Sequence, residues 1–168
     1  MNRLSADAVV IGGGAAGLMC ACTAAERGRS VIILEPNRDL GRKLRITGKG
    51  RCNLTNNCDI KTIMANIPGD GRFLYSALTA FPPEKVMETF EGMGVPLKTE
   101  RGNRVFPVSD NANDIAGALS DRAHRLGVRV IRSKAKKIMV SDGGVTGVET
   151  ESGVIDCAAA AVCTGGLS

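Results

Sequence analysis

Three glycines near the N-terminus are spaced as in turns that bind a dinucleotide. Gly12, Gly14 and Gly17 form the pattern G-x-G-x-x-G directly after an apolar run, with Ala15 and Ala16 between the last two. The first glycine permits a tight turn, the second lets the backbone approach a pyrophosphate, and the third lets helix and strand pack closely. The N-terminus of such a helix supplies N–H groups and partial positive charge for phosphate oxygens. The spacing therefore predicts a pyrophosphate-binding turn over residues 12–17.

An acidic residue follows where the ribose of such a dinucleotide would bind. Glu35 stands eighteen residues after Gly17, at the end of the next apolar run. Its carboxylate can accept hydrogen bonds from ribose hydroxyls and would repel a 2′-phosphate. This context favours a dinucleotide site over a glycine-rich turn without a ligand. It does not distinguish FAD from NAD.

A basic, glycine-rich segment comes next. Residues 38–51 carry six basic side chains and one acidic side chain, which accounts for the whole net charge of +5. A charge concentrated in one segment favours a local anion over a nucleic-acid backbone, and the absence of Trp with only four Phe and one Tyr argues against base stacking. The stretch GRKLRITGKGRCNLTN (Gly41 to Asn56) is not a P-loop, because Gly50 follows Lys49 where Ser or Thr is needed. Two interpretations remain: a solvated basic loop, or a loop lining a phosphate and a ring edge.

The surrounding sequence predicts a βαβ unit that positions the glycine turn. Ala6–Ile11 reads as a buried strand, Ala15–Arg27 as a helix of small residues, and Val31–Leu34 as the second strand. Pro36–Asp59 shows neither a helical nor a strand period and is expected to be a long functional loop.

The rest of the chain predicts helices, a hairpin and a run of strands. Helices are expected at Phe73–Ala80, Pro83–Glu91 and Ala112–Leu126, and a hairpin at Pro96–Thr99 and Arg104–Pro107. Five strands separated by glycine-rich turns follow at Val128–Ile131, Lys137–Val140, Val145–Thr150, Val154–Cys157 and Ala159–Cys163. The predicted fold class is therefore α/β and Rossmann-like, a parallel sheet with an added antiparallel β-ribbon.

Cysteine and histidine usage favours a reduced, metal-free protein. The six cysteines have neither a disulfide pattern nor zinc spacing, and His124, the only histidine, is expected to be exposed. Cys52 has two interpretations: a thiol acidified by Lys49 and Arg51 that exchanges electrons with a cofactor, or a small packing residue, which we prefer. The uncharged residues 8–25 could pass for a signal peptide or a membrane span, but Gly12–Gly14 interrupt them. We expect a cytoplasmic protein with neither a membrane nor a nucleic-acid partner.

Four segments resemble those of the BaiN/YhiN-like flavoproteins, the aminoacetone oxidase family of NAD(P)/FAD-dependent oxidoreductases. They are GGGAAGL, GRKLRITGKGRCNLTN, GNRVFPVSDNANDIAGAL (Gly102 to Leu119) and CTGGLS at the C-terminus. The resemblance implies a flavoprotein of the two-dinucleotide-binding-domain type with FAD pyrophosphate at Gly12–Gly17 and its adenosine ribose at Glu35. It places Arg42, Lys43, Thr47, Gly48, Arg51, Cys52 and Asn53 along the flavin side, and Thr164, Gly165 and Gly166 in a turn beside FAD.

The resemblance also implies an activity. Electrons would pass between NAD(P)H or a small organic substrate and an acceptor through FAD, with no substrate or catalytic residue identified. Family members are more than twice as long, so residues 1–168 are expected to be an N-terminal FAD-binding domain without the inserted substrate domain and the C-terminal FAD segment. The alternative is a dinucleotide-binding module that acts as a sensor or an interaction domain without catalysis.

Overall fold

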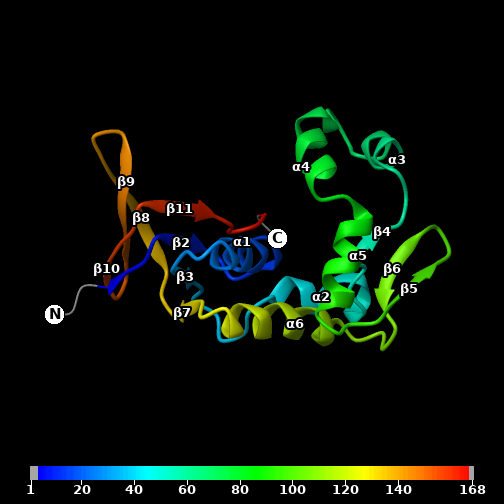
Figure 1. Cartoon of the computed structure of the whole chain (residues 1–168), viewed down its shortest axis with the longest axis horizontal. Coiled ribbons are helices and arrows are strands. Elements are labelled where there is room, and N and C mark those ends of the chain that lie inside the picture. The colour runs from blue at the N-terminus through cyan, green and yellow to red at the C-terminus, as the bar shows by residue number, and fades with distance from the viewer. Residues whose placement is uncertain (1–3, 167–168) are drawn as a thin grey trace. The chain divides into compact units, whose positions relative to one another are not determined.

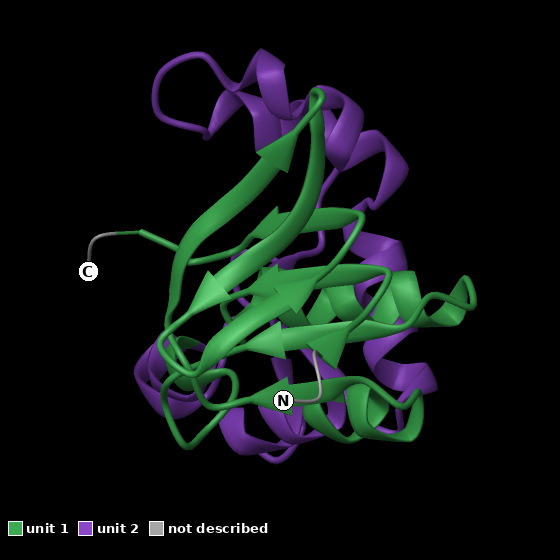
Figure 2. Ribbon diagram, turned by 90° about the vertical axis from the view of Figure 1, so that its left-hand side faces the viewer, with its two compact units in different colours: residues 1–43, 119–168 green, residues 44–118 purple. Residues whose placement is uncertain are grey.

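The structure is a computed structural model that describes residues 4–166. The chain divides into two compact units: unit 1 comprises Met1–Lys43 and Leu119–Ser168, and unit 2 comprises Leu44–Ala118 (Figure 2). Leu167 and Ser168, the last two residues of the CTGGLS motif, lie outside the described residues.

Unit 1 is built on a four-stranded parallel sheet in the order β11-β2-β3-β7 (Figure 1). The strands are β2 (Ala8–Ile11), β3 (Val31–Leu34), β7 (Arg129–Ile131) and β11 (Ala159–Val162). Helix α1 (Ala15–Glu26) connects β2 to β3, which pair in parallel with Ala8 opposite Val31. All four residues of β3 are buried, as expected for an inner strand of a parallel sheet. The predicted βαβ unit is confirmed.

A second sheet in unit 1 has the order β1-β10-β9-β8. It contains β1 (Leu4–Ser5), β8 (Ala135–Ser141), β9 (Gly144–Thr150) and β10 (Gly153–Asp156). The last three form the predicted antiparallel ribbon, and β1 joins β10 in parallel. The two sheets share one apolar core cluster, made of Val9, Ile32, Leu34, Val148, Ile155 and Cys157.

Unit 2 contains a three-stranded antiparallel sheet in the order β4-β6-β5 and several short helices. The strands are β4 (Thr55–Asn56), β5 (Leu97–Glu100) and β6 (Arg104–Pro107), and the last two confirm the predicted hairpin. The helices are α3 (Ile60–Ala65), the 3₁₀ turn η1 (Gly71–Leu74), α4 (Tyr75–Ala80) and α5 (Pro83–Gly92).

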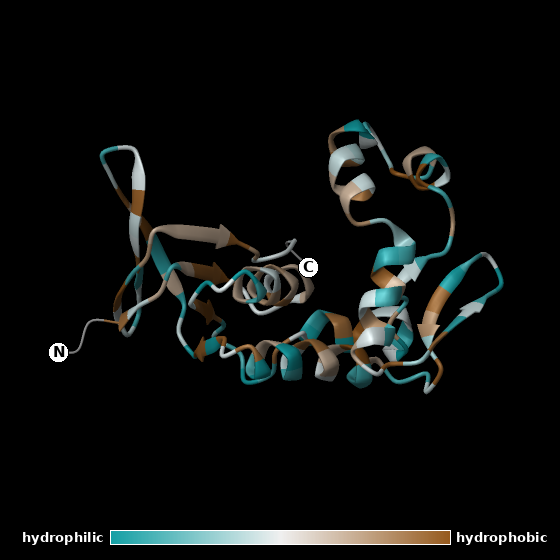
Figure 3. Ribbon diagram, in the orientation of Figure 1, coloured by the Kyte–Doolittle hydropathy of each residue, from teal (hydrophilic) through white to brown (hydrophobic). Residues whose placement is uncertain are grey.

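Helix α6 (Ala112–Arg125) begins in unit 2 and ends in unit 1. Its buried residues recur every three or four positions, so one face of the helix, which includes Ile115 and Leu119, is buried, and polar residues lie between them in the sequence (Figure 3). His124 is exposed on this helix, as predicted. No helix among residues 4–166 is long and apolar enough to cross a membrane.

The segment expected to be an irregular loop contains regular structure, so that part of the prediction is wrong. Helix α2 (Arg42–Gly50) and strand β4 both lie within Pro36–Asp59. The helical backbone of α2 is interrupted at Thr47, and Gly48 and Lys49 have positive φ, so the regular part is little more than one turn. One turn and a two-residue strand are too short to show a period, and contacts made elsewhere in the fold stabilise them.

Candidate functional site

The glycine turn after β2 is packed too tightly for any side chain at two of its three positions. A Cβ on Gly17 would lie 1.9 Å from the carbonyl oxygen of Gly12. A Cβ on Gly12, where φ is +109°, would lie 2.4 Å from the carbonyl oxygen of Cys163 at the end of β11. Glycine is therefore required at both positions, so that α1 approaches the turn and the turn approaches β11.

The third glycine of the pattern faces open space. Gly14 is the N-cap of α1, and a Cβ there would meet no atom within 4 Å. No side chain caps the helix at this end, and its first turn contains no acidic residue. The N–H groups of a first helical turn lack partners within the helix and carry partial positive charge. The N-terminus of α1 is therefore suited to an anionic group such as a pyrophosphate.

Glu35 supports this turn through hydrogen bonds. Its Oε2 accepts from the backbone N–H of Gly13 at 2.9 Å, and its Oε1 accepts from the backbone N and Nδ2 of Asn37 at 2.9 and 2.6 Å. Burial alone would raise the pKa of Glu35, but the hydrogen bonds from Asn37 and Gly13 outweigh it, and the pKa lies below its ordinary value. The carboxylate is thus ionised and fixed beside the turn, with acceptor capacity left for hydroxyl groups.

Two further predicted segments meet the glycine turn within unit 1. The N–H of Gly41, directly before α2, donates to the carbonyl of Gly13 at 2.8 Å, which places the start of α2 beside the turn. Lys43 on α2 donates from Nζ to the carbonyl of Gly166 at 3.2 Å. The structure therefore brings Gly12–Gly17, Glu35, the Arg42–Lys43 pair and Thr164–Gly166 together.

The remaining predicted residues form a separate tight turn in unit 2. The N–H of Cys52 donates to the carbonyl of Thr47 at 3.0 Å, and Gly48, Lys49 and Cys52 all have positive φ. A Cβ on Gly48 would lie 2.7 Å from the backbone nitrogen of Asn53, so glycine is needed there as well.

Arg51 is held by a network that the sequence did not predict. Its guanidinium donates to Asp110 Oδ1, with Nε at 2.8 Å, and forms an ion pair with Glu100, while Lys98 Nζ donates to Asp110 Oδ2 at 2.7 Å. The guanidinium also lies over the ring of Phe106, 4.2 Å from its centroid. The contact with Phe106 joins the RCNLTN segment (Arg51 to Asn56) to the RVFPVS segment (Arg104 to Ser109), and the two segments also pair as β4 and β6. Arg51 therefore fixes the turn, with its charge already met by two carboxylates.

Cys52 is a packing residue in this structure. Its side chain is buried, and this burial raises the pKa of the thiol despite a hydrogen bond with Thr47 that lowers it. A raised pKa keeps the thiol protonated near neutral pH, which disfavours the redox interpretation. All six cysteines have free thiols in this structure.

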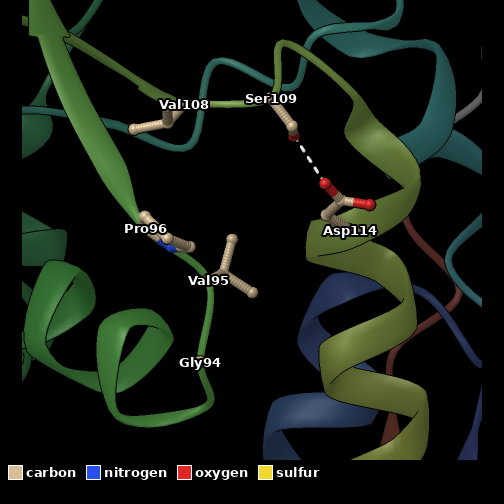
Figure 4. Close-up of a pocket in the computed structure, with 6 residues that line it drawn as sticks. All are labelled: Gly94, Val95, Pro96, Val108, Ser109 and Asp114. Carbon is tan, nitrogen blue, oxygen red and sulfur yellow. Dashed lines mark hydrogen bonds between the residues drawn. The ribbon is translucent and has the colours of Figure 1, made fainter.

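Two cavities lie within unit 2. One, of about 310 Å³, is bordered by Val95, Pro96 and Val108 on its apolar side (Figure 4). At its polar side, Ser109 Oγ donates to Asp114 Oδ2 at 2.5 Å, so the hydroxyl and the carboxylate are already hydrogen-bonded to each other. The other cavity, of about 520 Å³, lies between α3 and the β5–β6 turn and has a more polar lining. Sequence reasoning identified neither cavity, because both are formed by segments that are far apart in the chain.

The chain matches one family along almost its whole length. The HI0933-like protein Rossmann domain matches residues 6–168. The chain is 29% identical over 164 residues to the ribosomal RNA dihydrouridine synthase of Escherichia coli (strain K12), covering 96% of this chain and 40% of the relative. It is 33% identical over 143 residues to the 3-dehydro-bile acid delta(4,6)-reductase of Clostridium scindens, covering 82% of this chain and 33% of the relative. The chain thus spans two fifths or less of these relatives. Neither is named an aminoacetone oxidase, so the resemblance holds at the level of the flavoprotein family.

Solved structures agree on the fold. A 3-ketosteroid-delta4-(5alpha)-dehydrogenase from Rhodococcus jostii RHA1 has a TM-score of 0.72 at 18% identity, covering 96% of this chain and 46% of that one. Glycine oxidase from Bacillus cereus ATCC 14579 has a TM-score of 0.62 at 16% identity, covering 96% and 56%. At such low identities these likenesses support the Rossmann-like α/β fold alone. Because the family model spans nearly the whole chain, the protein belongs to the HI0933-like Rossmann-domain family of FAD-binding flavoproteins.

Proposed function

We propose that this chain is the FAD-binding part of a flavin-dependent oxidoreductase. The observation that carries the proposal is the uncapped N-terminus of α1, open at Gly14, with Glu35 and Lys43 held beside the same turn. FAD carries a pyrophosphate and a ribose, which are the groups that such a cradle fits. When bound, it would supply hydride and electron transfer.

Each predicted residue has a role in this proposal. The turn residues Gly12, Gly14, Ala15, Ala16 and Gly17 would hold the pyrophosphate, and Glu35 would hold the adenosine ribose. Flanking contacts would come from Arg42, Lys43, Thr164, Gly165 and Gly166. Thr47, Gly48, Arg51, Cys52 and Asn53 would shape the flavin side. Arg51 would act there mainly by holding the turn rigid, because its charge is already paired.

The names of the relatives suggest a reaction class. One relative is a ribosomal RNA dihydrouridine synthase and another is a 3-dehydro-bile acid delta(4,6)-reductase, and both names describe the reduction of a C=C bond. We propose the same reaction class for the whole enzyme of which this chain would form the cofactor cradle, namely reduction of a C=C bond, with a small organic molecule as the substrate. NAD(P)H as electron donor and a cytoplasmic location are further parts of the proposal.

A charge reversal at Lys43 tests FAD binding. FAD is titrated into the 168-residue chain while its fluorescence is followed, for wild type, Lys43→Glu and the control Lys137→Glu. Lys137 is exposed on β8 in the same unit and forms no ion pair with any residue that the structure describes. We expect Lys43→Glu to raise the Kd for FAD about tenfold or more, because an acidic group replaces the cation beside the phosphate-binding turn, and Lys137→Glu to leave it unchanged. Equal Kd values for the two variants, or no binding by wild type, would overturn the proposal.

The alternative is a dinucleotide-binding module without catalysis. Anaerobic addition of NADH or NADPH to the FAD-loaded chain distinguishes the two. Bleaching of the flavin absorbance at a rate proportional to protein supports the oxidoreductase, whereas bound FAD that no donor reduces supports the module.

A further inference from the structure

The larger cavity of unit 2 has a composition that the proposed FAD cradle does not explain. It has a volume of about 520 Å³, within the range of about 300–1,000 Å³ that is typical of small-molecule sites. Its wall is formed by the end of β4, by Cys58, by α3 with the turn after it, and by the β5–β6 turn at Gly102 and Asn103. All of these segments belong to unit 2, so the cavity is a feature of that unit alone.

The lining of this cavity carries no charged side chain. Its polar members are amides, a hydroxyl and a thiol, and its apolar members are Ile63 and Ile67 on and just after α3. A charged ligand would find no counter-charge in such a wall and would lose its hydration without compensation. An uncharged ring is different, because its faces can contact the two isoleucines while its edge reaches the polar groups. The lining therefore favours a neutral, planar ligand.

Three asparagines supply hydrogen-bonding groups of known orientation. Asn56 Nδ2 donates to the carbonyl of Gly102, and Asn66 Nδ2 donates to the carbonyl of Thr62, both at 2.8 Å. Because a carbonyl only accepts, each of these amides must turn its nitrogen to the carbonyl and keep its Oδ1 as a remaining acceptor.

The third asparagine offers both kinds of group. Asn103 is exposed at φ +58°, and its side-chain amide has no hydrogen-bond partner among the residues that the structure describes. Its backbone is fixed, because its carbonyl accepts from the N–H of Asn57 at 2.7 Å. The asparagines that line the cavity therefore retain two acceptor oxygens together with one amide that can both donate and accept.

We propose that this cavity binds a neutral planar heterocycle through an amide edge, in which a carbonyl lies beside an N–H. The N–H groups of that edge would donate to Oδ1 of Asn56 or Asn66, and its carbonyl would accept from Nδ2 of Asn103. Pyrimidine bases carry this edge within the ring, and nicotinamide carries it as an exocyclic carboxamide. The inference concerns unit 2 and does not rest on FAD binding in unit 1.

Protection of Cys58 from alkylation tests the proposal. Cys58 lines the cavity and is half-buried, so an occupant should slow its reaction with iodoacetamide, as followed by peptide mass spectrometry. The 168-residue chain is treated with and without uracil, nicotinamide or 1,3-dimethyluracil, which keeps the ring and carbonyls of uracil but lacks both N–H groups. We expect uracil, nicotinamide or both to protect Cys58 and not Cys20. Half-protection by dimethyluracil should need about a tenfold higher concentration, because two neutral hydrogen bonds are lost.

A matched pair of variants tests the role of Asn103. Asn103→Gly removes the side-chain amide and leaves a residue that tolerates positive φ. The control Asp142→Gly makes a matching change to glycine at another position of positive φ (+51°), in the β8–β9 turn. We expect Asn103→Gly to raise the half-protecting concentration about fivefold or more and Asp142→Gly to leave it unchanged. Saturation-transfer NMR of the same ligands gives a second readout that does not require the thiol.

Three results would overturn the inference. Protection by both uracil and dimethyluracil at the same concentration would show that no amide edge is recognised, and no saturation transfer from either uracil or nicotinamide would show that the cavity binds neither. Displacement of these ligands by one equivalent of FAD would assign the cavity to the flavin. Protection by one ligand only would instead identify which form of the amide edge the cavity recognises and would support the inference.

Discussion

Gly17 on α1 lies against the carbonyl oxygen of Gly12, so closely that a Cβ atom on residue 17 would lie 1.9 Å from that oxygen. This contact joins the first turn of the helix to the end of β2. Because the obstructing atom belongs to the backbone, no side-chain rotation can relieve the overlap. The contact therefore makes the glycine turn part of the fold of unit 1 as well as a candidate phosphate site.

A glycine-to-alanine pair separates these two roles. Gly17→Ala should lower the free energy of unfolding by about 1–3 kcal/mol or more, because overpacking forces the backbone apart. Gly14→Ala meets no atom within 4 Å and should cost less than about 1 kcal/mol, the price of a poorer N-cap. Urea denaturation of both variants measures the difference, and equal losses would contradict the argument.

The carboxylate of Glu35 makes stability depend on pH. Hydrogen bonds from Asn37 and Gly13 outweigh burial and hold its pKa below the ordinary value of 4.5, so its contribution is fully present above that value. The contribution is lost as the pH falls through the lower pKa of the folded state. The stability gap between wild type and Glu35→Gln should therefore be widest near neutral pH and narrow on acidification. Urea midpoints at several pH values check this, with Glu151→Gln, at an exposed turn, as the control. A gap that stays constant would contradict the prediction.

The Arg51 network predicts that lysine cannot replace this arginine. Arg51→Lys keeps the charge but loses the planar contacts with Asp110 and the stacking on Phe106, so the Tm should fall by a few degrees. Arg72→Lys is the matched control, because among the described residues Arg72 pairs with Asp70 alone, two residues away on an exposed segment. Differential scanning fluorimetry at low and high salt measures both. A Tm of Arg51→Lys equal to that of the control would show that the network contributes nothing.

Burial of Cys52 predicts slow alkylation. The pKa of its thiol is raised, so little thiolate forms at neutral pH, and the side chain is 1% exposed. Under native conditions iodoacetamide should modify Cys58 well before Cys52, and unfolding in urea should remove the difference. Early modification of Cys52 would restore the redox interpretation.

Local signals predicted much of the fold. The run of apolar residues in Val31–Leu34, the proline and glycine that bracket α5, and the turn between Leu97–Glu100 and Arg104–Pro107 each determine their element within a few residues of sequence. Helix α3 also has a local signal in the sequence: Asp59 caps it by accepting from the N–H of Thr62 at 2.9 Å.

The sequence predicted only the part of the site that is formed by the first βαβ unit. The glycine turn and Glu35 follow from spacing alone, and the structure places them together. The partners of Arg51 could not be predicted in this way, because Glu100 and Asp110 lie 49 and 59 residues further along the chain. The cavity beside α3 depends on the same kind of long-range pairing, between β4 and the β5–β6 turn.

The strand order β11-β2-β3-β7 has a consequence for the time course of folding. Ala8 pairs on one side with Val31 and on the other with Ala159. Closing the short loop through α1 costs little entropy, whereas closing the long loop costs more and must await the synthesis of β11. Gly12, which packs against Cys163, therefore cannot reach its final surroundings until β11 has been synthesised. During synthesis β2 and β3 would be able to pair first, and the phosphate-binding turn would be completed only after β11 has joined β2.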